Sequence, residues 1–302
     1  MTRMIGSMAE LRFFCMDLAM AILLEGKRRD LDGIDVTRIL PHAKKRMIGP
    51  FIFFDRMGPV EFAPGSGLNV KPHPHIGLST ITYLTEGSIL HRDSLGNELE
   101  ILPGEVNWMV AGKGIVHSER ETDAVRNASH ILNGIQAWVA LPLGQAECEP
   151  AFDHYRREQL PDIRMEGIQG ILIAGTAWGQ TSPVKTHSPM CYLDLTLQTG
   201  ALLQAPPEAE ECAVYVLEGQ MMVGDELFSE GELVLLEDGD AVTALAETRL
   251  LMLGGDHWPQ IPRINWNFVS FDRSRIEQAR EDWQQQRFPK VPGDDQEYTP
   301  LP

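Results

Sequence analysis

The chain has 302 residues, and a hydrophobic share of 43% provides enough apolar side chains for one large domain or two of ordinary size. Its 43 acidic and 26 basic residues give a net charge of −17, and so acidic a surface disfavours direct binding to nucleic acid. None of the four cysteines belongs to a CxxC pair, which fits reduced thiols in a cytoplasmic protein.

The first apolar segment, residues 11–24, contains Asp17 and is followed by Glu25 and a basic cluster. These charges argue against a secretory leader, and the segment is too short and interrupted to span a bilayer. No other segment is long and apolar enough to do so, and we expect no membrane association. Residues 1–33 are therefore interpreted as an N-terminal extension, either a short helix or a poorly ordered segment.

From Ile34 onward, short runs of Val, Ile, Leu, Phe and Thr are separated by Gly, Pro, Asp and Asn. This pattern is typical of β-strands joined by tight turns. A hairpin is predicted from residues 88–92 and 98–102, with its corner at Gly96-Asn97. Many short strands and few helical periods favour an all-β sandwich or barrel.

The second half of the chain repeats the first. Residues 83–87 read Tyr-Leu-Thr-Glu-Gly and residues 215–219 read Tyr-Val-Leu-Glu-Gly. Each copy is followed by a hairpin and then by a Gly-Glu pair, at Gly104 and at Gly231. The repeat predicts two similar β-barrels in tandem, which we place at residues 34–160 and 161–260.

After the second barrel, residues 261–302 are expected to pack on the barrels. Residues 270–283 have apolar side chains at helical spacing, which predicts a helix. Residues 288–302 contain four prolines and are expected to form an extended arm along the surface.

Two short motifs in the first repeat carry candidate metal ligands. In His73-Pro74-His75 the imidazoles are two residues apart, so on a strand both point to one face. His117-Ser118-Glu119 repeats this spacing with an imidazole and a carboxylate. Three neutral imidazoles and one carboxylate suit Fe²⁺, Mn²⁺, Ni²⁺, Cu²⁺ or Zn²⁺. The sequence therefore predicts one divalent transition metal held by His73, His75, His117 and Glu119.

The alternative is that these residues are ordinary surface or core side chains, because nine histidines in 302 residues is unremarkable. The repeat argues against this. In approximate register, Ala205 and Pro207 stand where the first copy has its His-x-His pair, and Ala244 and Ala246 stand where it has His117 and Glu119. A barrel that needed these histidines would carry them in both copies.

Residues 34–302 resemble the pirin family, whose members are bicupins. The resemblance rests on the long stretches 73–87, 91–97 and 103–119, which include His-Pro-His-Ile-Gly and Gly-Lys-Gly-Ile-Val-His-Ser-Glu. It implies two cupin barrels, with His73, His75, His117 and Glu119 as the ligands and with metal only in the N-terminal barrel. Ser79 stands where many pirins carry a glutamate, which implies four ligands and no fifth.

The resemblance implies two functions. The first is a metal-dependent oxidoreductase similar to quercetin 2,3-dioxygenase, which opens a flavonol-type ring with O₂ and expels carbon monoxide. Glu119 is then the catalytic base that takes the substrate's hydroxyl proton. The second is an iron- or redox-responsive regulator that binds a protein partner, a transcription factor or a metabolic enzyme. A degenerate cupin or an isomerase rests on fold analogy alone. Fe²⁺ is the first expectation, with Mn²⁺, Ni²⁺, Co²⁺, Cu²⁺ and Zn²⁺ as alternatives.

A few other side chains have two interpretations. His91 is interpreted as structural, with support of the metal ligands as the alternative. The remaining histidines have no partner at ligand spacing and are interpreted as structural. Four large apolar residues are either plain core or lining of the barrel cavity: Phe53, Tyr83, Trp108 and Met109.

Overall fold

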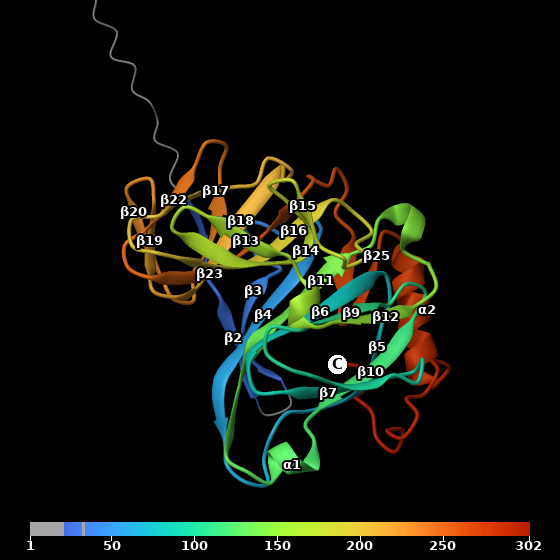
Figure 1. The fold of residues 1–302 in the computed structure, drawn as a ribbon. Helices are drawn as coiled ribbons and strands as arrows, with labels where there is room; N and C mark the ends of the chain where they lie inside the picture. Colours follow the sequence, from blue (N-terminus) through green and yellow to red (C-terminus); the bar gives the residue numbers. More distant parts are fainter. Residues whose placement is uncertain (1–20, 32–33) are drawn as a thin grey trace, which may run out of the picture.

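The computed structural model describes residues 21–31 and 34–302, which form two cupin barrels followed by a C-terminal helix and tail. Figure 1 shows the barrels side by side, the second at the upper left and the first below it, with α2 (Arg273–Gln284) beside the first. The all-β tandem arrangement predicted from the repeat is confirmed. Within the described residues, no helix has the length and apolar run needed to cross a bilayer.

Two antiparallel sheets make up the first barrel. The larger contains seven strands, in the spatial order β12 (Ala151–Tyr155), β9 (Val106–Val110), β6 (Leu78–Glu86), β11 (His130–Ala140), β4 (Phe51–Phe62), β3 (Ile34–Leu40) and β2 (Lys27–Leu31). The smaller contains four, in the order β5 (Asn69–His75), β10 (Ile115–Arg120), β7 (Ile89–Asp93) and β8 (Glu98–Ile101). Strands β7 and β8 form the predicted hairpin, with the expected turn at residues 94–97.

The second barrel has the same plan. Its larger sheet has the order β1 (Ile22–Leu24), β21 (Leu233–Leu236), β18 (Glu211–Glu218), β23 (Thr248–Gly255), β16 (Met190–Leu197), β14 (Ile168–Ala177) and β13 (Asp162–Met165), with β15 (Gln180–Thr181) paired to β14. Its smaller sheet has the order β17 (Leu202–Gln204), β22 (Ala241–Ala244), β19 (Gln220–Val223) and β20 (Glu226–Ser229).

The sequence repeat corresponds to equivalent corners of the two barrels. Strand β6 ends at Glu86 and β18 ends at Glu218, and each is followed by a glycine with a positive φ, 82° at Gly87 and 89° at Gly219. A side chain is strained in this conformation, so glycine is the residue that fits. The Glu-Gly pairs are therefore the turns that send each barrel strand into its hairpin.

The N-terminal segment forms strands, which its sequence did not predict. The apolar residues Ile22–Leu24 form strand β1 rather than helix, and residues 1–20 of that segment lie outside the described part of the chain. Strand β1 pairs with β21 of the second barrel, whereas β2 pairs with β3 of the first. The beginning of the described chain thus contributes one edge strand to each barrel.

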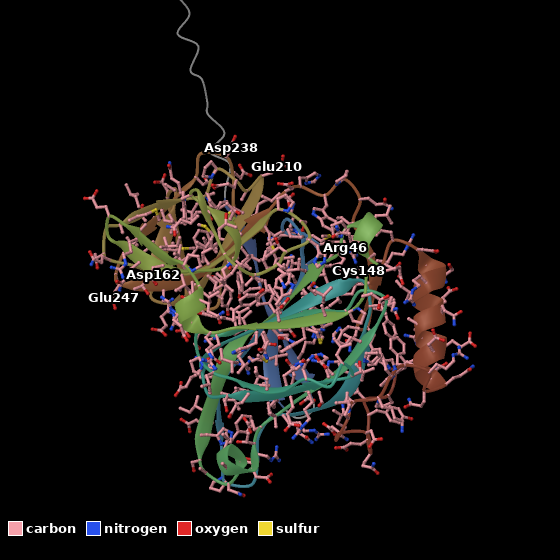
Figure 2. The ribbon with its side chains drawn as sticks, turned by 45° about the vertical axis from the view of Figure 1, so that its right-hand side comes forward. Arg46, Cys148, Asp162, Glu210, Asp238 and Glu247 are labelled. Atoms are coloured by element: carbon pink, nitrogen blue, oxygen red, sulfur yellow. The ribbon has the colours of Figure 1, made fainter. Side chains whose placement is uncertain are left out.

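The largest apolar core lies between the barrels. It combines Phe51, Phe54 and Trp108 of the first barrel with Tyr192 and Tyr215 of the second. Phe51 contacts Tyr192 with ring centroids 5.6 Å apart, and Phe54 contacts Tyr215 at 5.3 Å. In Figure 2 side chains fill the space between the two barrels. Burial of this shared surface makes the barrels one packed unit.

Short helices and the C-terminal segment complete the fold. They are α1 (Asp123–Arg126), the 3₁₀ turns at Leu143–Gln145 and Arg157–Gln159, the hairpin of β24 (Arg263–Asn265) and β25 (Phe268–Ser270), and helix α2. Helix α2 begins after its cap Asp272 and buries Ile276, Ala279 and Trp283, as its spacing predicts. The arm 288–302 follows and lies against the first barrel through the buried Val291.

Candidate metal centre

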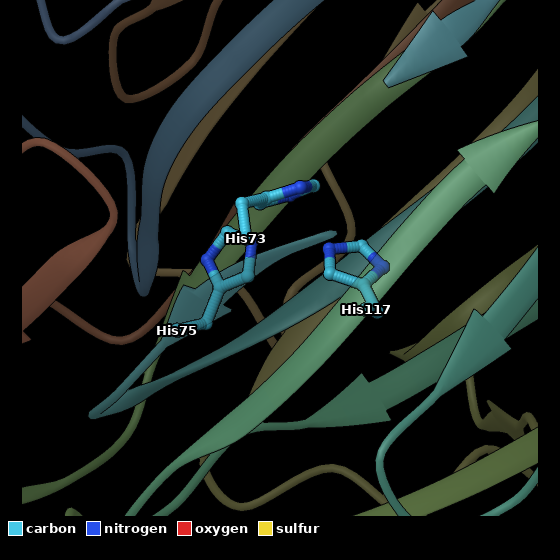
Figure 3. Close-up of side chains that lie close together, drawn as sticks. All are labelled: His73, His75 and His117. Atoms are coloured by element: carbon cyan, nitrogen blue, oxygen red, sulfur yellow. The ribbon is translucent and has the colours of Figure 1, made fainter. Parts of the chain in front are cut away.

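The two predicted ligand motifs lie on neighbouring strands. Strand β5 carries His73 and His75, β10 carries His117 and Glu119, and the two strands are paired antiparallel with His117 directly opposite His73. The alternation of side chains along β5 places both of its histidines on the same face. Figure 3 shows His117 pointing from its strand toward His73 and His75.

The three histidines form a compact cluster. Ring centroids are 4.4 Å apart for His73 and His117, and 5.0 Å apart for each pair that includes His75. One ring nitrogen from each lies within 4.8 Å of the others, an arrangement able to hold one metal ion. His73 Nδ1 is 2.8 Å from the carbonyl oxygen of Lys71. Since a carbonyl only accepts, Nδ1 carries a proton, so the neutral form of His73 has its lone pair on Nε2.

The other two imidazoles are fully buried. No ring nitrogen of His75 or His117 has a hydrogen bond of good geometry within the described structure, although the backbone of Asn267 lies near His75 and partly offsets the lowering of its pKa. Burial, and then the charge of His73, hold the pKa of each well below the ordinary value of 6.5. Both rings are therefore neutral at pH 7 and available as ligands. Four orphaned nitrogens in a core are costly unless an ion takes some of them, so the donor set fits a transition metal.

Glu119 lines the same cavity but stands apart from the three histidines. Its carboxylate does not belong to the group of donors within 4.8 Å of one another. The Thr82 hydroxyl is 3.0 Å from Glu119 Oε1, and Gln136 Nε2 is 3.3 Å from the same oxygen. Burial raises the pKa of Glu119, opposed by the charge of His91 and by these two hydrogen bonds. Thr82 and Gln136, which sequence analysis missed, thus hold the carboxylate beside the cluster.

His91 lies next to the site on the third strand of the sheet. It is opposite Glu119 in the β7–β10 pairing, and its ring centroid is 5.3 Å from that of His117. Its ring stacks on Phe152 at 4.4 Å, and Nε2 is 3.2 Å from Asp93. Asp93 also accepts from the turn that follows, at Leu95 and Asn97. His91 therefore packs against Phe152, as the structural interpretation predicts, and it also lies beside the ligand residue His117, as the alternative requires.

The cluster opens into a cavity of about 470 Å³ in the first barrel. One wall is aromatic, with Phe53 stacked on Trp138 at 3.9 Å and Trp138 edge-on to His75 at 5.1 Å. The Arg38 guanidinium lies 4.4 Å from the centre of the Phe53 ring and pairs with Asp55 at 2.8 Å. The remaining lining comes from Arg29, from apolar residues of the barrel and from the C-terminal segment: Pro41, Met57, Leu68, Val70, Ile264, Trp266, Asn267 and Thr299.

Of the four residues offered as cavity lining or core, only Phe53 lines this cavity. Tyr83 and Trp108 belong to the core between the barrels, and Met109 packs in the same apolar cluster as Phe53 and Trp138. Strand alternation assigns a residue to one of two faces, but both faces of this sheet are buried, so the sequence did not distinguish them.

Among the described residues, the second barrel has no counterpart of the histidine cluster. Its interior is filled by apolar side chains, including Leu203, Met221 and Val242. Ala244, the approximate counterpart of His117, is buried among them. The contrast between the barrels agrees with the asymmetry of the repeat.

A chain of two tandem cupin barrels with one histidine cluster in the N-terminal barrel is a bicupin. The pirin family model matches residues 33–139, and the model of the pirin C-terminal cupin domain matches residues 192–289. The chain is 42% identical over 287 residues to a pirin-like protein of Caulobacter vibrioides, covering 93% of this chain and 99% of that one. The chain belongs to the pirin family.

Other relatives carry enzyme names. A Pseudomonas aeruginosa protein provisionally named quercetin 2,3-dioxygenase is 40% identical, covering 84% of this chain and 80% of that one. The crystal structure of quercetin 2,3-dioxygenase from Acinetobacter baumannii has a TM-score of 0.84 and 32% identity, covering 94% of each chain. The structure of an Escherichia coli pirin in complex with nickel(II) has a TM-score of 0.62 at 20% identity, a likeness of fold.

Proposed function

We propose that this pirin is a metal-dependent dioxygenase that opens a flavonol-like aromatic ring with O₂. The observation that carries the proposal is the histidine cluster on the wall of an aromatic cavity, with one buried carboxylate beside it. A cavity of about 470 Å³ is of the size that holds a small organic molecule. The family resemblance and the enzyme names of two relatives support the same class of reaction.

His73, His75 and His117 would hold the ion, with Glu119 as the fourth ligand. Glu119 lies two residues after His117 on the same strand and lines the same cavity. A bound divalent ion supplies a Lewis acid and a template for substrate and dioxygen. Fe²⁺ is the metal we expect first, and elemental analysis of protein purified without added metal tests this directly.

Glu119 is the residue that we assign to proton transfer. Because burial raises its pKa, the ionised carboxylate is a stronger base than a free glutamate. Glu119 also lines the cavity that a phenolic hydroxyl would enter. Thr82 and Gln136 keep the carboxylate oriented while it holds the proton. Phe53 and Trp138 line the cavity and offer aromatic surface to an aromatic substrate.

The test is turnover of quercetin by protein loaded anaerobically with Fe²⁺, Mn²⁺, Co²⁺, Ni²⁺ or Cu²⁺ and then exposed to air. We expect loss of the flavonol absorbance with at least one metal. A metal-loaded sample that leaves the flavonol unchanged with every ion contradicts the proposal.

Replacement of the base tests its assignment. We expect Glu119→Gln to reduce turnover by about 10²- to 10⁴-fold, the usual contribution of a positioned base. The matched control is Glu98→Gln, which alters a carboxylate on the outside of the same small sheet, 60% exposed and paired with Arg92. Full activity in Glu119→Gln, measured at equal metal content, would remove Glu119 from this role.

A further inference from the structure

The C-terminal tail lies along the free edge of the strand that carries two of the histidines. Strand β5 is the outermost strand of its sheet. In its pairing with β10, His117 is opposite His73, but Glu119 is opposite Val70, so β5 has one residue more than β10 at this point. This is a β-bulge, and it leaves Lys71 and Pro72 without opposite residues in the ladder.

Thr299 of the tail bonds to both carbonyls of the bulge. Its backbone N–H donates to the carbonyl of Pro72 at 2.9 Å, and its hydroxyl donates to the carbonyl of Lys71 at 3.3 Å. The Lys71 carbonyl is also the acceptor for His73 Nδ1, at 2.8 Å. One carbonyl therefore orients a ligand ring and anchors the tail. Thr299 is itself part of the cavity wall.

Ion pairs fasten the tail beside the ligands of both strands. Arg120, the residue after Glu119, pairs with Asp294 at 2.6 Å and with Glu297 at 3.0 Å. Lys71, two residues before His73, pairs with Glu297 at 3.3 Å. The Arg120 and Asp294 side chains are only 17% and 11% exposed, so this pair is partly shielded from water.

Helix α2 holds the tail from the other side. Trp283 Nε1 donates to the carbonyl of Thr299 at 2.9 Å, and Tyr298 contacts the Trp283 ring with centroids 5.6 Å apart. Trp283 is itself buried in an apolar cluster with Ile76 and Val116, which follow and precede the ligand residues. The contacts with Trp283 thus hold Thr299 in position independently of its hydrogen bonds to the bulge.

We propose that Thr299 is a positioning residue for the metal centre and that the tail, residues 294–302, must be seated on the β5 bulge for His73 to present Nε2 to the ion. Thr299 fixes the Lys71 carbonyl, and that carbonyl fixes the tautomer and the rotation of the His73 ring. The inference rests on the metal site of the proposed function, although it does not depend on which reaction occurs there.

The experiment measures Ni²⁺ affinity by calorimetry for the full chain, for a chain that ends at Asp295, and for Thr299→Val and Thr299→Ser. Loss of residues 296–302 removes both hydrogen bonds from Thr299 to the bulge and one ion-pair partner, Glu297. We expect Kd to rise about 10- to 100-fold, as for loss of other contacts that orient ligands. Thr299→Val keeps the shape and loses the hydroxyl, so a several-fold rise is expected. Thr299→Ser keeps the hydroxyl and should bind as the full chain does.

A chain lacking only the exposed Pro302 is the control for shortening itself, and its Kd should be unchanged. A second readout is the ¹⁵N NMR shifts of His73 in the metal-free protein, which we expect to show the Nδ1–H tautomer in the full chain and a mixture in Thr299→Val. A purely structural role for the tail would leave these shifts where they are.

Each result decides between the two proposals. If the full chain binds no Ni²⁺, the metal site itself is wrong. If the full chain binds and the folded shortened chain binds equally well, the metal site stands and the role of the tail is wrong. If the shortened chain does not fold, equal Kd values and equal His73 shifts in Thr299→Val and Thr299→Ser overturn the inference.

Discussion

Three imidazoles are enclosed in one barrel, so the stability and the metal binding of this protein depend on the protonation of single residues. His75 and His117 are fully buried, and burial keeps their pKa values well below 6.5. In the unfolded chain the same side chains titrate near 6.5. Protons therefore bind the unfolded chain more tightly, and acid destabilises the folded, metal-free protein.

The sign of this effect gives a prediction for pH. Above about pH 6.5 neither state is protonated at these rings, so they contribute no slope. As pH falls below that value, the free energy of unfolding of the metal-free protein should decrease. In His117→Gln one such group is gone, and the slope between pH 7 and pH 5.5 should be shallower. Denaturant titrations of both proteins at several pH values measure this, and identical slopes would contradict it.

Metal binding should also depend on the protonation of these imidazoles. An ion competes with protons for the imidazole nitrogens, so binding should weaken as the solution is acidified. Because His75 and His117 resist protonation in the folded chain, this weakening should begin at a lower pH than for histidines in water. His73 differs from them, since its Nδ1 already donates to Lys71 and only Nε2 remains to bind.

Among the elements, the turn before β10 is the one that brings His117 to the cluster. Gly112 has φ of 50°, and its carbonyl accepts from the N–H of Gly77, which links the turns next to β5 and β10. A Cβ on Gly112 would lie 2.0 Å from the carbonyl oxygen of Cys148. No flexible side chain can relieve that contact, because the oxygen belongs to the backbone.

Alanine substitution at two glycines distinguishes the cost of a positive φ from the cost of a steric clash of the added Cβ. Gly112→Ala combines an unfavourable φ with a backbone clash, and we expect a loss of about 2–4 kcal/mol in the free energy of unfolding. Gly96→Ala, in the β7–β8 turn, has φ of 91° but no atom within 4 Å of its Cβ. It should cost only about 1–2 kcal/mol. Equal losses in thermal or denaturant unfolding would show that the contact with Cys148 is unimportant.

Elements with a strong local pattern could be predicted from the sequence. The His-x-His and His-x-Glu spacings identified the inward face of β5 and β10, and Ile276, Ala279 and Trp283 identified α2. The bulge in β5 could not be predicted, because its carbonyls at Lys71 and Pro72 bond to a tail residue more than 200 positions away in the sequence. Thr82, Gln136 and Thr299 gave no signal, since an isolated polar residue in a strand or tail has no periodic partner.

The N-terminal strands show a second limit of sequence patterns. Residues 22–24 are the end of an apolar run, and three residues are too few to distinguish a strand from a helix. Their partner, β21, lies more than 200 residues further along the chain. Long-range pairing of this kind overrides local propensity, and no pattern within the segment reports it.

Across the whole molecule, the two barrels are joined by a buried polar contact within their shared core. The Tyr83 hydroxyl donates to Asp194 Oδ2 at 2.7 Å, and Arg249 bonds to both oxygens of the same carboxylate, at 3.0 and 2.6 Å. Burial, and then the charge of Asp194, raise the pKa of Tyr83 well above its ordinary value of 10, so it remains a donor. The contact fixes one barrel against the other.

A pair of tyrosine variants measures the contribution of that contact. Tyr83→Phe removes a hydrogen bond to a buried charged group and should lower the free energy of unfolding by about 1.5–3 kcal/mol. Tyr192 lies in the same core, with its hydroxyl buried and unbonded in the described structure, so Tyr192→Phe should be neutral or stabilising. Ni²⁺ affinity should be unchanged in both. A larger loss for Tyr192→Phe than for Tyr83→Phe would contradict this assignment.

Strand β1 also has a consequence for the order in which the protein is made. Ile22–Leu24 leave the ribosome before either barrel exists, yet their partners, Leu233–Leu235, are synthesised after most of the chain. Strand β1 therefore has no partner strand until β21 is made. Until then Leu24, which is fully buried in the finished core, remains exposed. Domains usually fold in the order of their synthesis. Here an early segment closes one edge of the larger sheet of the second barrel, so that edge is completed only after β21 has been synthesised.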